Sequence, residues 1–96
     1  MLSIRRLGWD PWNVAHIARH RVAPEEVEEV CIRHPVTSVT YAGRLRVIGP
    51  TRAGRVLTAI LAPDDEPGVY YVVTARPASR KERRRYRELR GGGDDG

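Results

Sequence analysis

The clearest chemical signal in this sequence is a run of cations over residues 80–90. It contains seven cations against two acids, and its net charge of +5 equals that of the whole chain. The cations are Arg80, Lys81, Arg83, Arg84, Arg85, Arg87 and Arg90. A concentrated positive field attracts polyanions, and guanidinium groups bind phosphate through paired N–H donors. The run therefore predicts a surface for nucleic acid or an acidic partner, although such runs often only keep a protein soluble.

Two histidines, His16 and His20, stand four residues apart and would share one face of a helix. That spacing allows metal binding, but no third ligand accompanies them and the segment lacks a metallohydrolase motif. We therefore predict no metal and no cofactor. His20 can instead serve as an acid or base, because histidine titrates near neutral pH. The alternative is a histidine that only favours the dipole at the end of its helix.

Two N-terminal helices are predicted to precede the strands. The first covers residues 11–20, because Asp10 is a good N-cap and Pro11 suits the first helical position. Its apolar stripe would consist of Trp12, Val14, Ile17 and Ala18. The second begins at Pro24, where acidic residues favour the helix dipole, and ends before Pro35.

After Pro35 the pattern changes to the alternation of β-strands. Four strands are predicted, over residues 37–41, 44–48, 55–61 and 69–76. Ala42 and Gly43 would form a two-residue hairpin connection. Connections this short exclude parallel crossovers between neighbouring strands, so the sheet should be mainly antiparallel with the helices on one face. The predicted fold class is α+β.

The last helix has a well-defined start. Ser79 is its predicted N-cap, and Glu82 completes a capping box three residues later. Tyr86 and Leu89 are the expected docking residues of this helix. Residues 1–90 should form a single domain, and the Gly/Asp-rich residues 91–96 should be disordered because they have nothing to bury.

The composition favours a soluble cytoplasmic protein. Cys31 is the single cysteine, so no internal disulfide can form, and we expect it to be buried and inert. No apolar run approaches the roughly twenty residues that cross a bilayer, and the N-terminus lacks the apolar core of a signal peptide.

Several motifs at the two ends of the sequence carry a family resemblance. They are Trp9-Asp10-Pro11, Ala18-Arg19-His20-Arg21-Val22 with Pro24-Glu25-Glu26-Val27, and Thr74-Ala75-Arg76-Pro77-Ala78-Ser79-Arg80-Lys81-Glu82-Arg83 leading to Tyr86. In this order they resemble the BrnT family, which are toxins of bacterial type II toxin–antitoxin systems. The resemblance extends over residues 9–89, and the middle strands match in pattern only.

The resemblance implies a compact fold like that of the RelE and ParE toxins, and a ribonuclease that needs no metal. The implied partners are an RNA substrate and a BrnA-like ribbon-helix-helix antitoxin, and the toxin could form a homodimer within that complex. One position departs from the family, which usually has glycine where this chain has Arg21. A non-glycine residue in a left-handed cap costs on the order of 1 kcal/mol. A long arginine there could either reach phosphate or block it.

Cleavage of RNA without a metal needs a base for the 2′-hydroxyl, cations for the charge that builds on phosphorus, and an acid for the departing oxygen. Arg76 is the favoured cation, because it follows a strand directly before the basic helix and matches the family motif. The less certain members of the site are His20, Arg46, Glu82 and Tyr86. Arg76 could instead form a structural ion pair with an acid of the first helices.

Glu82 could serve only as a cap, and Tyr86 could only anchor its helix to the sheet. Arg44 and Arg46 alternate with apolar residues, so both should lie on the exposed face of a strand and could line a cleft. The predicted RNA-binding residues are Arg44, Arg80, Lys81, Arg83, Arg84 and Arg87.

The leading hypothesis is an mRNA-cleaving toxin that inhibits translation and is neutralised by its antitoxin. The alternative is a non-catalytic nucleic-acid-binding or complex-forming module of the same fold. Arg21 favours this alternative, whereas the intact block from Arg76 to Tyr86 favours the enzyme.

Overall fold

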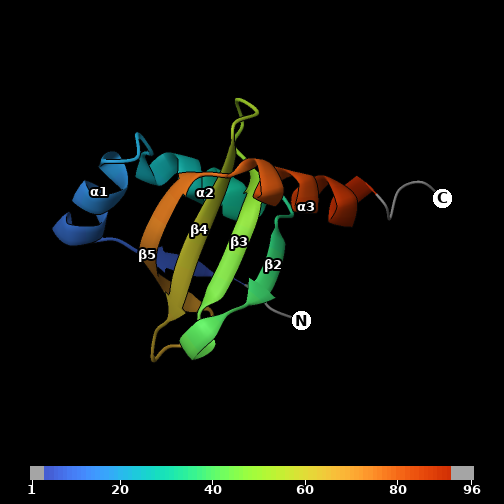
Figure 1. Cartoon of the computed structure of the whole chain (residues 1–96). Coiled ribbons are helices and arrows are strands. Elements are labelled where there is room, and N and C mark those ends of the chain that lie inside the picture. The colour runs from blue at the N-terminus through green and yellow to red at the C-terminus, as the bar shows by residue number, and fades with distance from the viewer. Residues whose placement is uncertain (1–3, 92–96) are drawn as a thin grey trace.

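The computed structural model describes residues 4–91, which form three helices and one five-stranded sheet (Figure 1). The helices are α1 (Pro11–Ala18), α2 (Pro24–Ile32) and α3 (Arg80–Gly91). The strands are β1 (Arg6–Gly8), β2 (Val36–Val39), β3 (Leu45–Pro50), β4 (Val56–Pro63) and β5 (Val69–Pro77). The predicted α+β class is confirmed. Gly91 ends α3, and the rest of the predicted Gly/Asp tail lies outside the described residues. No helix in residues 4–91 is long and apolar enough to cross a bilayer.

The sheet has a strand that the sequence did not predict. The strand order is β1-β5-β4-β3-β2, and β1 runs parallel to β5, with Arg6 opposite Val69 and Gly8 opposite Tyr71. The remaining neighbours are antiparallel, as predicted. The expected four-stranded antiparallel sheet is therefore a five-stranded mixed sheet. A strand of three residues gives no alternation to detect, and its partner lies at the other end of the sequence.

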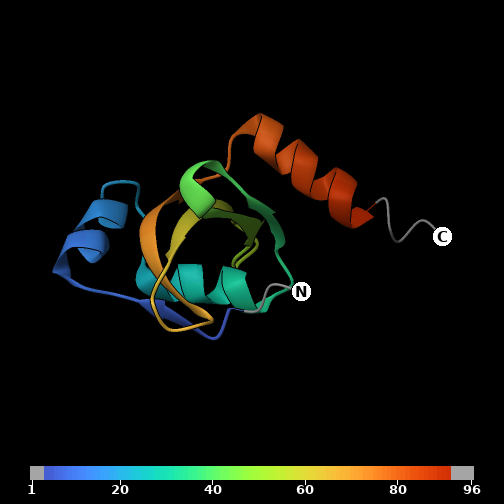
Figure 2. The ribbon, with the colours of Figure 1, turned by 90° about the horizontal axis from the view of Figure 1, so that it is seen from below.

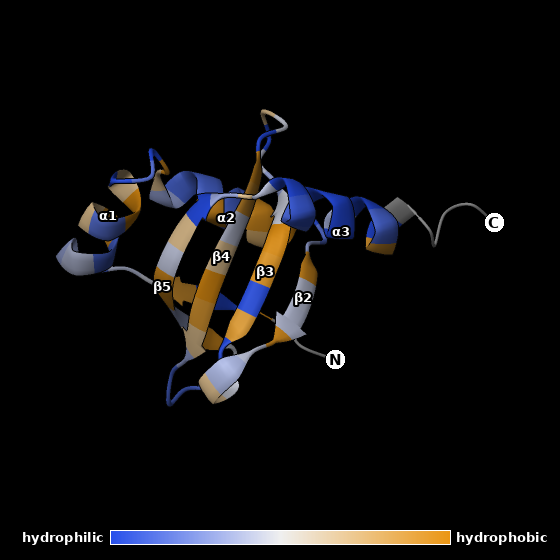
Figure 3. Ribbon diagram, viewed as in Figure 1, coloured by the Kyte–Doolittle hydropathy of each residue, from blue (hydrophilic) through white to orange (hydrophobic). Residues whose placement is uncertain are grey.

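Helices α2 and α3 lie on opposite faces of the sheet. Figure 2 shows α2 below the curved sheet and α3 above it. The main core fills the α2 side, where Val27 and Val30 pack with the buried Leu45, Val47, Leu57, Ala59 and Leu61. The prediction that the helices share one face is wrong for α3. Almost every residue of α3 is hydrophilic (Figure 3), and a helix without a broad apolar stripe cannot cover a core.

The start of α1 follows the predicted capping pattern. Asp10 Oδ1 accepts a hydrogen bond from the backbone N–H of Asn13 at 3.0 Å, and Asn13 Oδ1 accepts one from the backbone N–H of Asp10 at 2.9 Å. The buried residues of the helix are Asn13 and Ile17. Asn13 Nδ2 also donates to the carbonyls of Gly8 (2.9 Å) and Val72 (3.0 Å), which joins α1 to β1 and β5.

The predicted apolar stripe of α1 is correct only at Ile17. Trp12 is 82% exposed, and Val14 and Ala18 are also exposed. Asn13 takes the second core position because its amide satisfies two backbone carbonyls, which allows a polar side chain to be buried. The helix also ends at Ala18 rather than at residue 20.

The connection between β2 and β3 covers residues 40–44 and is longer than the two residues predicted. It contains the 3-10 turn Tyr41–Gly43, and the Thr40 amide donates to the Arg44 carbonyl across its base at 2.6 Å. Ala42 and Gly43 both have positive φ, at 63° and 72°. Both strands are therefore displaced from the predicted bounds. The register that results places Ser38 opposite Arg46.

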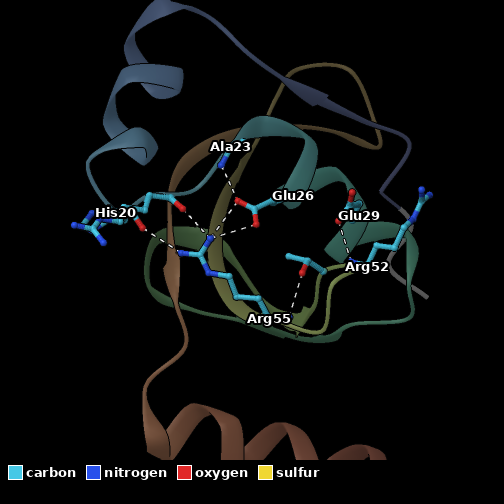
Figure 4. A network of polar contacts seen from close by, with 8 residues as sticks. His20, Ala23, Glu26, Glu29, Arg52 and Arg55 are labelled. Atoms are coloured by element: carbon cyan, nitrogen blue, oxygen red, sulfur yellow. Dashed lines mark hydrogen bonds and ion pairs between the residues drawn. The ribbon is translucent and has the colours of Figure 1, made fainter.

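The turn between α1 and α2 is held by a cation from the start of β4. Arg55 Nη1 donates to the Arg21 carbonyl at 2.7 Å and pairs with Glu26 at 3.2 Å, and Nη2 donates to the His20 carbonyl at 3.4 Å (Figure 4). Glu26 also accepts from the Ala23 amide at 3.0 Å, which caps α2. One guanidinium thus satisfies the carbonyls at the end of α1 and the carboxylate at the start of α2.

Arg21 has the left-handed conformation that the resemblance implied, with φ of 59°. Arg21→Gly should remove the steric penalty and raise the free energy of unfolding by up to about 1 kcal/mol. In a domain of this size that gain corresponds to a Tm increase of about 4–8 °C, measured by thermal unfolding. Arg21→Ala is the matched control, because it removes the long side chain but keeps the Cβ. An equal Tm gain in both variants would contradict the backbone explanation.

Candidate active site

Polar side chains from four strands share the sheet face on the side of α3. Residues opposite each other in register lie on the same face of a sheet. The first row is Ser38, Arg46, Ile60 and Thr74, and the second is Ile48, Thr58 and Arg76. Two arginines, one from β3 and one from β5, therefore stand on one face in neighbouring rows.

Arg76 is held by Glu82 of α3 in a two-bond ion pair. Arg76 Nη1 donates to Glu82 Oε1 at 2.7 Å, and Nη2 donates to Oε2 at 2.8 Å. The paired geometry is the strongest form of arginine–carboxylate contact. The structure thus brings together two predicted site residues. The acid that pairs with Arg76 belongs to α3. The structural alternative had proposed an acid of the first helices instead.

The same Glu82 carboxylate also fixes the start of α3. Its Oε1 accepts from the Ser79 amide at 2.8 Å and from Thr58 Oγ1 at 3.0 Å, while the Glu82 amide donates to Ser79 Oγ at 3.1 Å. The predicted capping box is therefore confirmed. The Glu82 side chain is only 14% exposed, whereas the Arg76 side chain is 41% exposed. Thr58 is a fully buried threonine that the sequence did not single out.

These contacts decide the protonation of Glu82. The hydrogen bonds from Arg76 are the largest cause, and they lower the pKa of Glu82 to about 2 against the opposing effect of its burial. Hydrogen bonds from Ser79 and Thr58 act in the same direction. The pKa of Arg76 is raised by the same pair. Glu82 is thus a carboxylate at neutral pH whose lone pairs are already used, and this favours positioning of Arg76 over proton abstraction.

Arg46 has a different environment from Arg76. It is half-buried in the centre of the face, and its Nε is a buried donor that has no hydrogen-bond partner among the described residues. An unpaired buried N–H costs roughly 1–3 kcal/mol. Arg44 is also half-buried and lies just before β3, at the end of the Tyr41–Gly43 turn. Arg46 does lie on the strand face away from the main core, whereas Arg44 precedes the strand.

His16, rather than His20, touches the sheet. His16 Nε2 lies 3.0 Å from Thr74 Oγ1, in hydrogen-bond contact, so His16 extends the row that contains Arg46. The His20 ring meets the His16 ring edge to face, with centroids 5.7 Å apart. The spacing predicted that the two rings would lie on one side, and they do meet, but His20 lies in the turn beyond α1 and not on the helix. The sequence analysis predicted no metal at this pair and proposed His20 as the acid or base, and it did not identify Thr74 as a partner of His16.

The remaining predicted residues lie along α3. Tyr86 is half-buried, one turn after Glu82, whereas Leu89 is 54% exposed and is not a docking residue. The predicted RNA-binding cations of the helix are all exposed: Arg80, Lys81, Arg83, Arg84 and Arg87. Arg83 Nη1 also donates to the Ala78 carbonyl at 2.9 Å. The basic helix therefore presents its charges to solvent beside the face that carries Arg46 and Arg76.

The described residues do not form a metal site. Within residues 4–91, no group of three or more His, Cys, Asp or Glu side chains is placed to hold an ion. Cys31 is half-buried rather than fully buried, and burial raises the pKa of its thiol to about 12, with Glu28 adding to the effect. The thiol is therefore protonated at neutral pH, which disfavours a nucleophilic role.

Comparison with known proteins bears on the fold. The sequence matches no protein-family model and no curated protein. Among solved structures it is similar to the 1.1 Å crystal structure of the Brucella abortus ribonuclease toxin BrnT, with a TM-score of 0.59 and 22% sequence identity. The match covers 83% of this chain and all of that one. The chain has the BrnT fold. The family resemblance of the end motifs is therefore confirmed at the level of the fold. In this chain the sheet face beside α3 carries the arginine pair.

The shared role of Glu82 leads to a pH-dependent prediction. Glu82→Gln should lower the free energy of unfolding at pH 7 by about 1–2 kcal/mol, because charge-assisted hydrogen bonds are lost. The pKa of Glu82 is lowered from 4.5 to about 2, so the carboxylate contributes fully above about pH 4.5 and loses its contribution as pH falls toward 2. The stability difference between wild type and variant should close over that interval, measured by denaturant unfolding.

Glu88→Gln is the control for this measurement, because Glu88 is an exposed acid of the same helix. Its effect should stay within about 0.5 kcal/mol at every pH. A difference between wild type and Glu82→Gln that stays constant from pH 5 to pH 2 would contradict the assigned role of the carboxylate.

Proposed function

We propose that this protein is a ribonuclease toxin of a type II toxin–antitoxin system, acting in the cytoplasm. It cleaves mRNA without a metal ion, inhibits translation, and is neutralised by a BrnA-like ribbon-helix-helix antitoxin. A homodimer within the toxin–antitoxin complex belongs to the same proposal. Support comes from the shared fold with a protein described as a ribonuclease toxin and from the arginine pair beside a basic helix.

The single observation that carries the proposal is the unpaired donor of Arg46. A buried guanidinium N–H without an acceptor is destabilising, and such a group calls for an explanation such as a bound water or a ligand-binding role. The neighbouring face offers cations and neutral donors rather than free carboxylates, since Glu82 is already engaged. An RNA phosphodiester fits this environment because it brings oxygen acceptors and a negative charge.

In the proposed reaction the RNA 2′-oxygen attacks the adjacent phosphorus. The O2′–P bond forms as the P–O5′ bond breaks, one proton leaves the 2′-hydroxyl for a base, and another reaches the departing 5′-oxygen from an acid. Arg46 and Arg76 stabilise the charge on the non-bridging oxygens. Guanidinium carries five N–H donors, so Arg76 keeps donors for phosphate while Glu82 orients it.

The two proton-transfer roles belong to the histidines and Tyr86. His16 is hydrogen-bonded to Thr74 on the same face and His20 contacts His16, so this pair supplies an imidazole that can exchange a proton with the RNA. Tyr86 stands one helical turn after Glu82 and is the second candidate for a proton donor. Glu82 takes part by holding Arg76. Arg44 and the exposed cations of α3 bind the flanking phosphates.

The second candidate function is a non-catalytic module that binds nucleic acid or assembles with a partner. One observation favours it: Arg76 already has a complete two-bond ion pair inside the protein, as a structural arginine would. Arg21, strained where the family usually has glycine, favours it as well. Binding of RNA without cleavage, and growth unaffected by expression of the chain alone, would select this candidate.

The enzyme proposal is tested with Arg46→Met and Arg76→Ala. Each should reduce the rate of cleavage of a single-stranded RNA in EDTA by about 10²–10³-fold, the usual cost of one transition-state donor. Arg46→Met should also leave stability unchanged or raise it, because it removes a buried unpaired donor. Cleavage is followed by gel electrophoresis of end-labelled RNA, and stability by thermal unfolding.

Arg33→Ala is the matched control for these variants, since Arg33 is an exposed arginine at the end of α2. It should retain wild-type cleavage. Wild-type protein that leaves RNA intact, or full activity in Arg46→Met, would overturn the enzyme proposal. In cells, expression of the wild-type chain alone should arrest growth, and co-expression of a ribbon-helix-helix antitoxin should restore it.

RNA binding can be tested separately from cleavage through its salt dependence. Each phosphate neutralised on a single strand contributes about −0.7 to the slope of log affinity against log salt concentration. Arg84→Ala removes one exposed cation of α3 and should make this slope less steep by up to about that amount. Fluorescence anisotropy of a labelled, non-cleavable 2′-O-methyl oligonucleotide gives the measurement. An unchanged slope would remove Arg84 from the RNA surface.

A further inference from the structure

The most exposed large apolar residue on α1, Trp12, lies one helical turn before His16, which contacts the sheet face of the candidate active site. Trp12 is 82% exposed in the first turn of the helix, whereas the other tryptophan, Trp9, is half-buried and donates from its indole Nε1 to Glu28 at 2.8 Å. A tryptophan that serves packing is normally buried, with its N–H in a hydrogen bond. Trp9 fits that description and Trp12 does not.

The position of Trp12 on its helix relates it to the sheet face. Trp12 and His16 share one face of α1, because side chains four residues apart lie one above the other on a helix. His20 lies in the turn just beyond the helix, where its ring contacts His16 and extends this aromatic stripe. His16 is anchored to Thr74, which belongs to the same row as Arg46. The stripe therefore borders the face that carries Arg46 and Arg76. Figure 1 shows α1 beside β5, on the side opposite to the direction in which α3 extends.

The stripe consists of three aromatic rings, and two of them already contact each other. The His16 and His20 rings meet at an interplanar angle of 75°. Rings beside a positively charged surface are the combination by which proteins hold single-stranded nucleic acids, because every base has a face that can stack. Arg46 and Arg76 on the sheet face, with the cations of α3 beyond them, supply the electrostatic part of that combination.

We propose that Trp12 is a stacking platform for an unpaired base of the RNA, next to the phosphate held by Arg46 and Arg76. This proposal rests on the proposed RNA substrate and adds a specificity element to it. The strand would cross the sheet face, with its backbone on the arginines and one base on the indole. Because stacking requires an unpaired base, the site would select single-stranded over double-stranded RNA.

Tryptophan fluorescence tests the proposal directly, because the chain has two tryptophans in contrasting positions. Trp9→Phe leaves Trp12 as the only tryptophan, and Trp12→Phe leaves Trp9, each excited selectively over the four tyrosines. Titration with a non-cleavable 2′-O-methyl oligonucleotide should quench the first protein and leave the second nearly unchanged. Strong quenching in Trp12→Phe, or none in Trp9→Phe while the oligonucleotide binds, would overturn the proposal.

A binding measurement keeps the test decisive should Trp9→Phe fail to fold. Trp12→Ala should weaken oligonucleotide binding by about 5- to 100-fold. Its exposed position means that folding should be unaffected, and Trp12→Phe should retain most of the affinity. The salt slope should stay as in wild type, unlike in Arg84→Ala, because stacking releases no counterions. Equal affinity of Trp12→Ala and wild type would overturn the proposal.

The outcomes separate this inference from the proposed function. If wild-type protein binds no oligonucleotide in the anisotropy assay, the RNA substrate itself is wrong. If RNA binds and is cleaved equally well by Trp12→Ala, only the stacking platform is lost. If Trp12→Ala keeps full RNA affinity but escapes neutralisation by a co-expressed antitoxin, the indole belongs to a protein interface and the stacking proposal is rejected.

Discussion

The structure depends most on one carboxylate that makes two sets of contacts. Glu82 closes the capping box with Ser79 and also receives both hydrogen bonds of the Arg76 fork. The first contact starts α3, and the second ties α3 to β5 and, through Thr58, to β4. The direction of the basic helix and the placement of Arg76 are therefore set by the same group. Helix α3 has few apolar residues with which to fix its own position, so these polar contacts take the place of a packed core.

The sequence predicted what is determined locally. The caps at Asp10 and Ser79 and the antiparallel order of β2 to β5 follow from residues close together in the chain, whereas the left-handed Arg21 was implied by the family resemblance. Strand β1 could not be predicted, because three residues carry no period. The burial of Asn13 depends on two carbonyls from distant strands, which no helical periodicity can reveal.

The sequence predicted several residues of the candidate site but not how they are arranged. Arg76 and Glu82 were both named, but their pairing was not, because the capping box gave Glu82 a sufficient role by itself. Arg46 was predicted, with Arg44, to lie on the exposed face of a strand. The burial of its Nε and the lack of a hydrogen-bond partner there depend on the neighbouring strands β2 and β4. Register across four strands brings Thr58 and Thr74 to the face, and register depends on turn lengths that sequence patterns give only approximately.

The pairing of β1 with β5 has a consequence for the order in which the chain can fold during synthesis. Strand β1 and helix α1 emerge first, yet both pack on β5: Arg6 pairs with Val69, and Asn13 donates to the Val72 carbonyl. These N-terminal elements have no surface to join until synthesis has passed β5. Contacts between distant parts of a chain form late and slowly. Arg76 lies near the end of that strand, so the face that would bind phosphate is completed only when nearly the whole chain has been made.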